Sequence, residues 1–243
     1  MNRFFLGIEN IHDDLVNFPP NISHQIARVL RLRVSEKVIV LDDRGMAYEV
    51  ELYHVEAQRV EGKVLGSEQV HSEPITKIHL LVGLTQREKF EWILQKGTEL
   101  GVSRFTPLLM QRCLVQVNKM AGSKIERWQT IVREAAEQSG RGLCPELDLP
   151  IALEKLPPIE GQLGLVLWEE EQGKGIRSFI NGSKSQEIKL IIGPEGGITK
   201  DEIDTLRELG YQVASLGKRI LRMETAAITA AAVVLFERGE MGG

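Results

Sequence analysis

The stretch from Ile188 to Ala232 constrains the fold of this chain more than any other. It begins with a short apolar run, Ile188 to Ile192, whose β-branched residues predict a buried strand. The run ends at Gly193-Pro194-Glu195-Gly196-Gly197, where glycine allows positive φ angles and a close approach of the backbone to a ligand. Thr199 and Glu202 then have the spacing of a capping box, which predicts the start of a helix.

A second strand with the same kind of ending follows this helix, which we expect to stop at Gly210. Tyr211 to Leu216 is the predicted strand, and it breaks into Gly217 and the basic loop Lys218-Arg219-Ile220-Leu221-Arg222. In open α/β sheets, ligands bind at the carboxyl ends of the strands. Two glycine loops at matching positions therefore favour a small-molecule site over the alternative of two ordinary tight turns.

The segments before this stretch alternate between strand and helix patterns. The predicted strands are Lys77 to Leu84, Phe105 to Met110 and Leu163 to Trp168. The first predicted helix is Glu88 to Leu100, closed by Gly101. The second begins at a capping box of Ser123 and Glu126 and runs to about Ser139. Its core side includes Ile125, Trp128 and Ile131. This alternation predicts an α/β domain with a mostly parallel sheet covered on both faces.

The segment before about residue 73 shows several short strand patterns separated by turn signals. The predicted strands are Arg3 to Leu6, Lys37 to Leu41, Ala47 to Tyr53 and Arg59 to Leu65. A short helix is predicted over Asn21 to Arg31, with Ile22, Ile26, Val29 and Leu30 as its apolar stripe. The pattern predicts a small β-barrel domain, and the polar stretch from Ser67 to Thr76 is the candidate linker to the next domain.

Arginines gather in this first segment. Arg28 and Arg31 are three residues apart in the predicted helix and should share a face, with Arg33 close by and Arg3 and Arg44 near in sequence or space. One interpretation is a phosphate-contacting patch. The other is an ordinary solvated face, which the acidic balance of the segment favours when spacing alone is considered.

Composition limits the classes of function. The chain has 243 residues, enough for two domains, and its net charge of −4 leaves no basic tail to indicate nucleic-acid binding. Cys113 and Cys144 lack metal-ligand spacing, as do the five histidines, so no metal site is expected and a reducing, cytosolic setting is favoured. With no apolar signal core and no run long enough to span a membrane, we expect a soluble intracellular protein.

The last predicted helix, Met223 to Glu237, has almost no polar face. A helix that is apolar all round should be buried. A terminal helix can be fully buried only if its own sheet or a second subunit covers it. The small residues of this helix permit the close approach of another helix. We therefore predict a homodimer through this helix, with packing on its own sheet as the alternative.

Familiar nucleotide fingerprints are absent from the sequence: it has no GxxxxGK[ST] and no early GxGxxG. Several other motifs occur in order: Arg28-Val29-Leu30-Arg31, Lys96-Gly97-Thr98-Glu99-Leu100-Gly101-Val102, Glu137-Gln138-Ser139 with Arg141, Gly193-Pro194-Glu195-Gly196-Gly197, and Leu216-Gly217-Lys218-Arg219-Ile220-Leu221-Arg222-Met223-Glu224-Thr225-Ala226. Together they resemble the RsmE-type ribosomal small-subunit RNA uracil-N3 methyltransferases of the SPOUT superfamily, over essentially the whole chain. Small departures are Ile198, where an aromatic residue is frequent, and Gly97, where alanine is.

The resemblance implies a fold and an activity. Residues 1–72 would form a PUA-like RNA-binding β-barrel, and residues 73–243 a SPOUT domain with a trefoil-knotted parallel sheet. The cofactor would be S-adenosyl-L-methionine, and the enzyme a cytoplasmic homodimer without a metal. The reaction would be methylation of N3 of one uridine in 16S rRNA of the small ribosomal subunit.

The resemblance also implies site residues. Cofactor contacts would come from Leu167, Trp168, Glu169, Ile192, Gly193, Pro194, Glu195, Gly196, Gly197, Leu216, Gly217, Ile220, Leu221, Arg222 and Thr225. Ile220 and Leu221 would supply an apolar floor for the adenine. RNA contacts would come from Arg3, Arg28, Arg31, Arg33, Arg112 and Arg141.

The chemistry suggests catalytic candidates. Uridine N3 becomes nucleophilic once its proton leaves, and the negative charge then spreads over the flanking carbonyl oxygens. Arg222 follows the cofactor loop and is the candidate for stabilising that charge, since an arginine stays charged and presents a fork of donors. Glu195 and Glu224 are the candidate carboxylates for orienting groups or accepting the proton, with helix capping or salt bridging as the alternative.

Three other functions stay open from the sequence. A related knotted methyltransferase acting on tRNA or another rRNA site would share the fold and cofactor. A non-catalytic RNA-binding assembly factor would lack cofactor binding, although the intact glycine loop argues against it. A nucleotide-dependent oxidoreductase is disfavoured by the missing fingerprint.

Overall fold

A computed structural model describes residues 1–113, 122–171 and 173–242 of the chain. The chain divides into two compact units. Unit 1 consists of Met1–Glu73 together with Ala136–Cys144, and unit 2 of Pro74–Ala135 together with Pro145–Gly243. We expected the first domain to end at residue 72, and that prediction left out the later segment of unit 1, Ala136–Cys144.

Unit 1 contains one sheet of six strands. They are β1 (Arg3–Phe5), β2 (Ile11–His12), β3 (Leu15–Phe18), β4 (Lys37–Leu41), β5 (Met46–Glu56) and β6 (Arg59–Gln69), in the order β1-β4-β5-β6-β3-β2. Only the β1–β4 pair is parallel, and the other pairs are antiparallel. Its core includes Phe4, Val16, Val38, Val50 and Leu52, and all of these except Phe4 alternate with exposed or half-buried neighbours along the strands. β2 and β3 were not predicted, and β6 extends into the stretch expected to be a linker.

The predicted helix over Asn21 to Arg31 is wrong in its second half. The structure has α1 (Pro20–His24) followed by a π-helical turn over Gln25–Val29, closed by the bond from Leu30 N–H to the Gln25 carbonyl at 2.9 Å. A π turn shifts the angular spacing of side chains, so the 3.6-residue stripe fails beyond Ile26. Val29 is 67% exposed, and Arg31 lies beyond the helix with a φ of +55°, so Arg28 and Arg31 share no helical face.

The segment after residue 135 completes unit 1. The Phe5 N–H donates to Glu137 Oε1 at 2.9 Å, and Ala136 packs with Phe5, Leu41 and Ala47. Glu73 and Arg141 form a buried ion pair at 2.7 Å between Arg141 Nη2 and Glu73 Oε2. These contacts join the start of the chain to a segment more than a hundred residues later.

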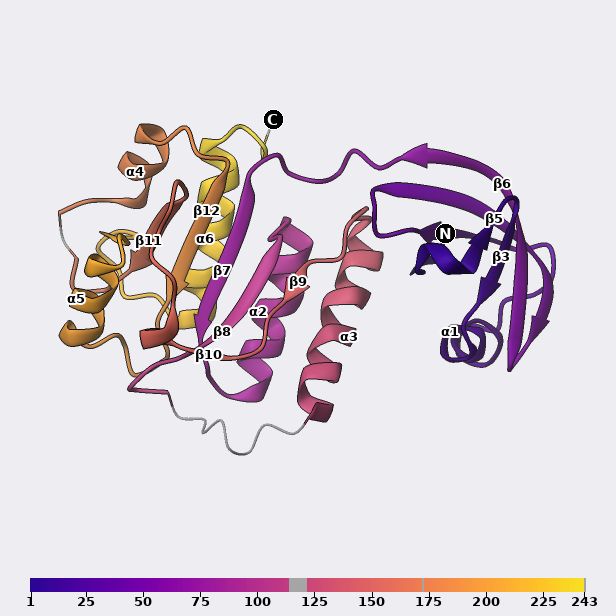
Figure 1. The fold of residues 1–243 in the computed structure, drawn as a ribbon, viewed down its shortest axis with the longest axis horizontal. Coiled ribbons are helices and arrows are strands. Elements are labelled where there is room, and N and C mark those ends of the chain that lie inside the picture. Colours follow the sequence, from indigo (N-terminus) through magenta and orange to yellow (C-terminus); the bar gives the residue numbers. More distant parts are fainter. Residues whose placement is uncertain (114–121, 172, 243) are drawn as a thin grey trace. The chain divides into compact units, whose positions relative to one another are not determined.

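Unit 2 contains a parallel sheet, as predicted. Its strands are β7 (Lys77–Gly83), β8 (Arg104–Leu109), β9 (Glu146–Leu147), β10 (Ile151–Ala152), β11 (Leu163–Leu167), β12 (Glu187–Ile192) and β13 (Gln212–Ala214). The order is β10-β8-β7-β12-β11-β13, with β9 also paired to β8. Every pairing is parallel, which requires the chain to cross over between successive strands, and helices supply most of these crossovers (Figure 1).

The helices that accompany this sheet are α2 (Arg87–Leu100), α4 (Ile176–Gly182), α5 (Lys200–Glu208) and α6 (Met223–Glu237); α3 (Gly122–Ser139) begins in unit 2 and ends in unit 1. From α5, Ile203 packs on the face that carries Val166 and Ile191. On the other face α2 approaches closely, because Gly97 leaves room for the Phe105 ring. The prediction of a sheet covered on both faces is therefore confirmed.

Several predicted element ends are confirmed and one is wrong. Thr199 caps α5 with Glu202 as a capping box, and Gly101 closes α2 with a φ of 107°. Gly122 is already helical, so Ser123 lies inside α3 and is not its cap. In α3 Trp128 is fully buried, whereas the predicted core residues Ile125 and Ile131 are half-buried.

Helix α6 is buried on one side only. Ala227, Ala230 and Val234 are fully buried, and α6 contacts β7, β12, α2 and α4. Phe236 is 61% exposed, so the chain by itself does not cover the helix all round. In the described parts of the chain, no helix combines the length and apolar character that crossing a membrane requires.

Candidate functional site

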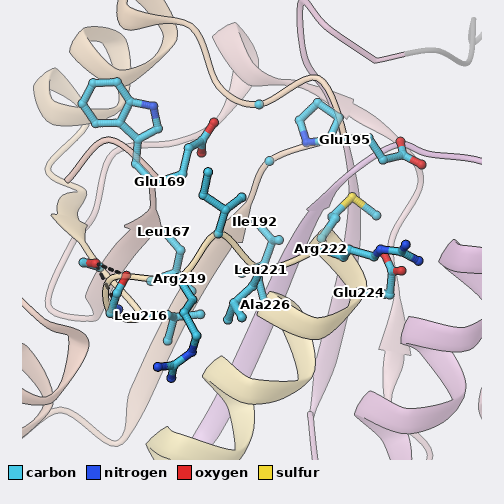
Figure 2. Close-up of a pocket in the computed structure, with 18 of the residues that line it drawn as sticks. Leu167, Glu169, Ile192, Glu195, Leu216, Arg219, Leu221, Arg222, Glu224 and Ala226 are labelled. Atoms are coloured by element: carbon cyan, nitrogen blue, oxygen red, sulfur yellow. Dashed lines mark hydrogen bonds between the residues drawn. The ribbon is translucent and has the colours of Figure 1, made fainter. Parts of the chain in front are cut away.

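Three adjacent strands of unit 2 end at the same edge of the sheet. Leu167, the last residue of β11, is paired with Ile192 of β12 on one side and with Ala214 of β13 on the other. The loops that follow therefore meet, and they enclose a cavity of about 590 Å³ (Figure 2). This volume lies within the usual range of small-molecule sites.

Most of the predicted cofactor residues line this cavity. They are Leu167, Trp168, Glu169, Ile192, Gly193, Pro194, Glu195, Gly197, Leu216, Gly217, Ile220, Leu221 and Arg222, and Glu224 lines it too. Gly196 and Thr225 are not among the lining residues, and Thr225 is exposed on α6. Residues that the sequence reasoning missed are Lys89, Ser215, Arg219, Met223 and Ala226.

The glycines of the loop after β12 are needed for close packing. A Cβ on Gly193 would lie 2.5 Å from the Ile198 side chain, and a Cβ on Gly83, at the end of β7, would lie 2.5 Å from the Pro194 nitrogen. Gly197 has a φ of +77°, a conformation that favours glycine. The loop therefore fits against β7 with bare backbone, and larger residues at these positions would displace it.

Polar contacts fix the same loop from the segment after β8. Arg112 Nη1 donates to the Gly196 carbonyl at 2.9 Å. Glu202 is buried, and its carboxylate accepts from the Gln111 N–H at 2.7 Å and from the Thr199 N–H at 2.9 Å. Arg112, which we predicted to contact RNA, is thus also an anchor of the glycine loop.

The loop after β13 forms the lower wall of the cavity in Figure 2. Ser215 and Gly217 are linked by two hydrogen bonds, and Gly217 has a φ of +110°. Ile220 lines the cavity and is 85% exposed, so its predicted role in an apolar floor stays a prediction. Further apolar lining comes from Leu167, Ile192, Leu216, Leu221 and Ala226.

Three charged residues lie together at one side of the cavity, while Glu169 and Arg219 lie elsewhere in its lining. Figure 2 shows Glu195, Arg222 and Glu224 on this side, with Leu167 and Leu216 opposite. Lys89 Nζ lies 2.8 Å from Glu195 Oε1. Burial raises the pKa of Glu195, but the hydrogen bond and charge of Lys89 outweigh it, so the net shift is downward. The ion pair in turn raises the pKa of Lys89.

Two buried polar atoms among the lining residues have no hydrogen-bond partner in the described parts of the chain. They are Trp168 Nε1, a donor, and Glu224 Oε2, an acceptor. Buried polar groups in folded proteins nearly always have a partner. An unpaired donor and an unpaired acceptor in the lining of one cavity indicate that a polar ligand completes the site.

The predicted RNA-contacting arginines fall into two groups. Arg3, Arg28, Arg31 and Arg33 are exposed in unit 1. Arg141 is only 4% exposed, and its guanidinium donates two hydrogen bonds to Glu73. The prediction for Arg141 is therefore corrected: a buried guanidinium held by a carboxylate cannot reach a phosphate, and its role is structural.

No group of three or more metal-ligating side chains occurs in the portion of the chain that the structure describes. The site offers glycine backbone, apolar walls, three carboxylates (Glu169, Glu195 and Glu224) and three cations (Lys89, Arg219 and Arg222).

These features define a ligand-binding α/β domain whose cavity lies at the carboxyl ends of three parallel strands. The chain belongs to the RNA methyltransferase domain family, which it matches over residues 71–235.

Similar proteins cover most of the chain. The ribosomal RNA small subunit methyltransferase E of Bacillus subtilis (strain 168) is 32% identical over 222 residues, which are 88% of this chain and 87% of the relative. A crystal structure of a ribosomal RNA small subunit methyltransferase E from Neisseria gonorrhoeae, bound to S-adenosyl methionine, is 33% identical with a TM-score of 0.86, covering 97% of both chains. A methyltransferase structure from Legionella pneumophila with bound S-adenosyl methionine is 30% identical with a TM-score of 0.88, again covering 97% of both.

Proposed function

We propose that this protein is an S-adenosyl-L-methionine-dependent methyltransferase that methylates N3 of one uridine in 16S rRNA of the small ribosomal subunit. The observation that carries the proposal is the glycine-walled cavity formed by the loops after β11, β12 and β13 in a member of the RNA methyltransferase family. The names of its relatives, ribosomal RNA small subunit methyltransferase E, support the substrate.

The residues present fit this cofactor. Gly193 and Gly197 let backbone N–H and C=O groups reach the polar edges of a nucleoside, and Leu216 and Leu221 offer apolar contact for its base. The unpaired Trp168 Nε1 is free to donate to an acceptor on the ligand. When bound, S-adenosyl-L-methionine supplies a methyl group on a positively charged sulfur, ready for transfer to a nucleophile.

The chain's own residues act on the uracil. The target base has to leave its pair and stack to bring N3 within reach of the cavity. Arg222 lines the cavity, is exposed and has no ion pair with any described residue, so its guanidinium is available to a uracil carbonyl oxygen. A fixed cation there stabilises the negative charge that develops as N3 loses its proton. Glu195 and Glu224 line the cavity on the side of Arg222 and are the candidates to orient groups or take that proton.

Unit 1 is proposed to be a PUA-like domain that holds RNA. The curled, mostly antiparallel sheet and the exposed Arg3, Arg28, Arg31 and Arg33 support this role. In unit 2 a knotted SPOUT topology is proposed, supported by the position of β12 between β7 and β11 in the sheet. We also propose a homodimer in the cytoplasm, with α6 at the subunit interface, because Phe236 stays exposed on an otherwise apolar helix.

The test is a methylation assay on small ribosomal subunits from a strain that lacks the endogenous enzyme. The purified protein and S-adenosyl-L-methionine are added, and the RNA nucleosides are analysed by mass spectrometry. We expect N3-methyluridine, and a loss of about 10²- to 10³-fold in rate for Arg222→Ala, the usual cost of removing one donor that stabilises transition-state charge. Absence of methylated nucleosides with the wild-type protein would refute the proposed function, and a full rate in the variant would refute only the role of Arg222.

A further inference from the structure

The two candidate carboxylates of the cavity are in different situations. Glu195 is engaged by Lys89, which reaches it from the first turn of α2 at 2.8 Å. Glu224, in the first turn of α6, lines the same side of the cavity, and its Oε2 is buried without a hydrogen-bond partner among the described residues. Of these two candidates, Glu195 is therefore a satisfied carboxylate and Glu224 has an unused acceptor.

The Lys89–Glu195 pair makes Glu195 a poor proton acceptor. A carboxylate that already accepts a short hydrogen bond from an ammonium group is stabilised in its charged form, and the pKa of Glu195 is accordingly lowered. Protonating Glu195 would remove the negative charge that the ammonium group of Lys89 stabilises. Glu224 forms no ion pair with a described residue, so protonation there loses no such stabilisation.

The unpaired acceptor of Glu224 and the guanidinium of Arg222 match the hydrogen-bonding edge of a uracil. The Watson–Crick edge of uracil presents an N–H donor between two carbonyl acceptors. Glu224 offers an acceptor for the N–H, and Arg222, at the N-cap of α6 two residues earlier, offers donors for a flanking carbonyl. Cytosine presents a bare acceptor at N3, which would face the Glu224 carboxylate with no hydrogen between them.

We propose that Glu224, and not Glu195, accepts the N3–H of the target uracil and takes its proton, and that the same contact selects uracil over cytosine. The inference rests on the proposed function and deepens it. In the step, the N3–H bond breaks and the proton forms an O–H bond at Glu224. The N3 electron pair forms the new N–C bond to the methyl carbon, and the electrons of the broken C–S bond stay with the sulfur. Glu224 then returns its proton to water.

The first test compares Glu224→Gln with Glu195→Gln in single-turnover methylation across pH, after mass spectrometry has located the uridine that the wild-type protein methylates. Glu224→Gln should lose about 10²- to 10⁴-fold at neutral pH, the usual contribution of a general base. Its rate should then rise about tenfold per pH unit, because the uracil must ionise on its own. Glu195→Gln should not acquire this steep rise, whatever its effect on the rate.

The second test does not depend on turnover. RNA carrying either the located uridine or a cytidine in its place is titrated against the protein without cofactor. Wild-type protein should bind the uridine RNA more tightly, and Glu224→Gln should lose the preference, since an amide can donate to cytosine N3. Calorimetric titration with S-adenosyl-L-methionine checks that the Glu224→Gln site is still formed.

The outcomes separate the two proposals. No N3-methyluridine from the wild-type protein refutes the proposed function. Methylation by the wild-type protein together with a wild-type pH profile and unchanged base preference in Glu224→Gln refutes the inference alone. A steep pH rise that is found in Glu195→Gln instead would assign the proton to Glu195.

Discussion

His79 on β7 should make the stability of unit 2 depend on pH. Its Nε2 lies 2.6 Å from the Thr106 hydroxyl oxygen and 3.7 Å from Asp148 Oδ2, and Arg104 donates two hydrogen bonds to Asp148. Burial lowers the pKa of His79 from 6.5 to about 4, assisted by the positive charges of Arg104 and Lys189 and opposed by Asp148. The folded protein therefore keeps this histidine neutral.

The sign and size of the effect follow by linkage. Between pH 6.5 and about 4 the unfolded chain binds a proton at His79 that the folded chain does not, so stability falls as the pH falls. The neutral histidine's contribution is fully present above pH 6.5. Lowering the pH from about 7.5 to about 5.0 should remove about 2 kcal/mol through this residue.

The assay can address unit 2 alone, because all three tryptophans, Trp92, Trp128 and Trp168, belong to it. Urea unfolding is followed by tryptophan fluorescence at both pH values for the wild-type protein and His79→Gln. The wild-type protein should lose about 2 kcal/mol more than the variant, while carboxylates that titrate elsewhere affect both alike. His24→Gln, at an exposed histidine of unit 1, is the matched control. Equal losses in the wild-type protein and His79→Gln would refute the reasoning.

Two further predictions concern packing and a buried charge. Gly83→Ala places a methyl group against the backbone of the glycine loop and should cost about 1–3 kcal/mol in strain, relieved only by moving that loop. Calorimetry should then show weaker cofactor binding. The control is Gly66→Ala, whose methyl group meets nothing within 4 Å, and it should change neither cofactor binding nor stability appreciably. Equal behaviour of the two variants would contradict the prediction. Glu73→Leu leaves the buried Arg141 without its carboxylate and should destabilise unit 1 by about 3 kcal/mol. Hydrogen exchange of unit 1 peptides measures this loss of stability. As the control, Asp14→Ala removes an exposed ion pair and should lower the stability of unit 1 by less than about 1 kcal/mol.

Local signals in the sequence were sufficient for much of unit 2. The apolar run from Ile188 to Ile192, the capping box of Thr199 and Glu202, and Gly101 at the end of α2 each have a physical cause within a few residues. Loops that follow neighbouring parallel strands have to meet at one edge, so their convergence on a cavity could also be predicted.

Features that depend on distant residues could not be predicted. Lys89 joins the site because α2 places it against Glu195, and nothing near Lys89 in the sequence signals that contact. Arg141 resembled an RNA contact because its partner Glu73 lies far away in the sequence. A local failure was the helix before Arg31, where the π turn breaks the periodicity from which we predicted a shared arginine face.

The later segment of unit 1 has a consequence for synthesis of the protein. Phe5 and its partner Glu137 are separated by 132 positions, so the ribosome has to translate the whole first segment of unit 2, Pro74–Ala135, before unit 1 can close. At translation rates of about 5–20 residues per second, the nascent unit 1 waits on the order of 10 s for this segment. During that interval Phe5 lacks its Glu137 bond and Glu73 lacks Arg141. The amino-terminal unit is therefore synthesised first but cannot complete its folding until α3 and the turn after it have left the exit tunnel.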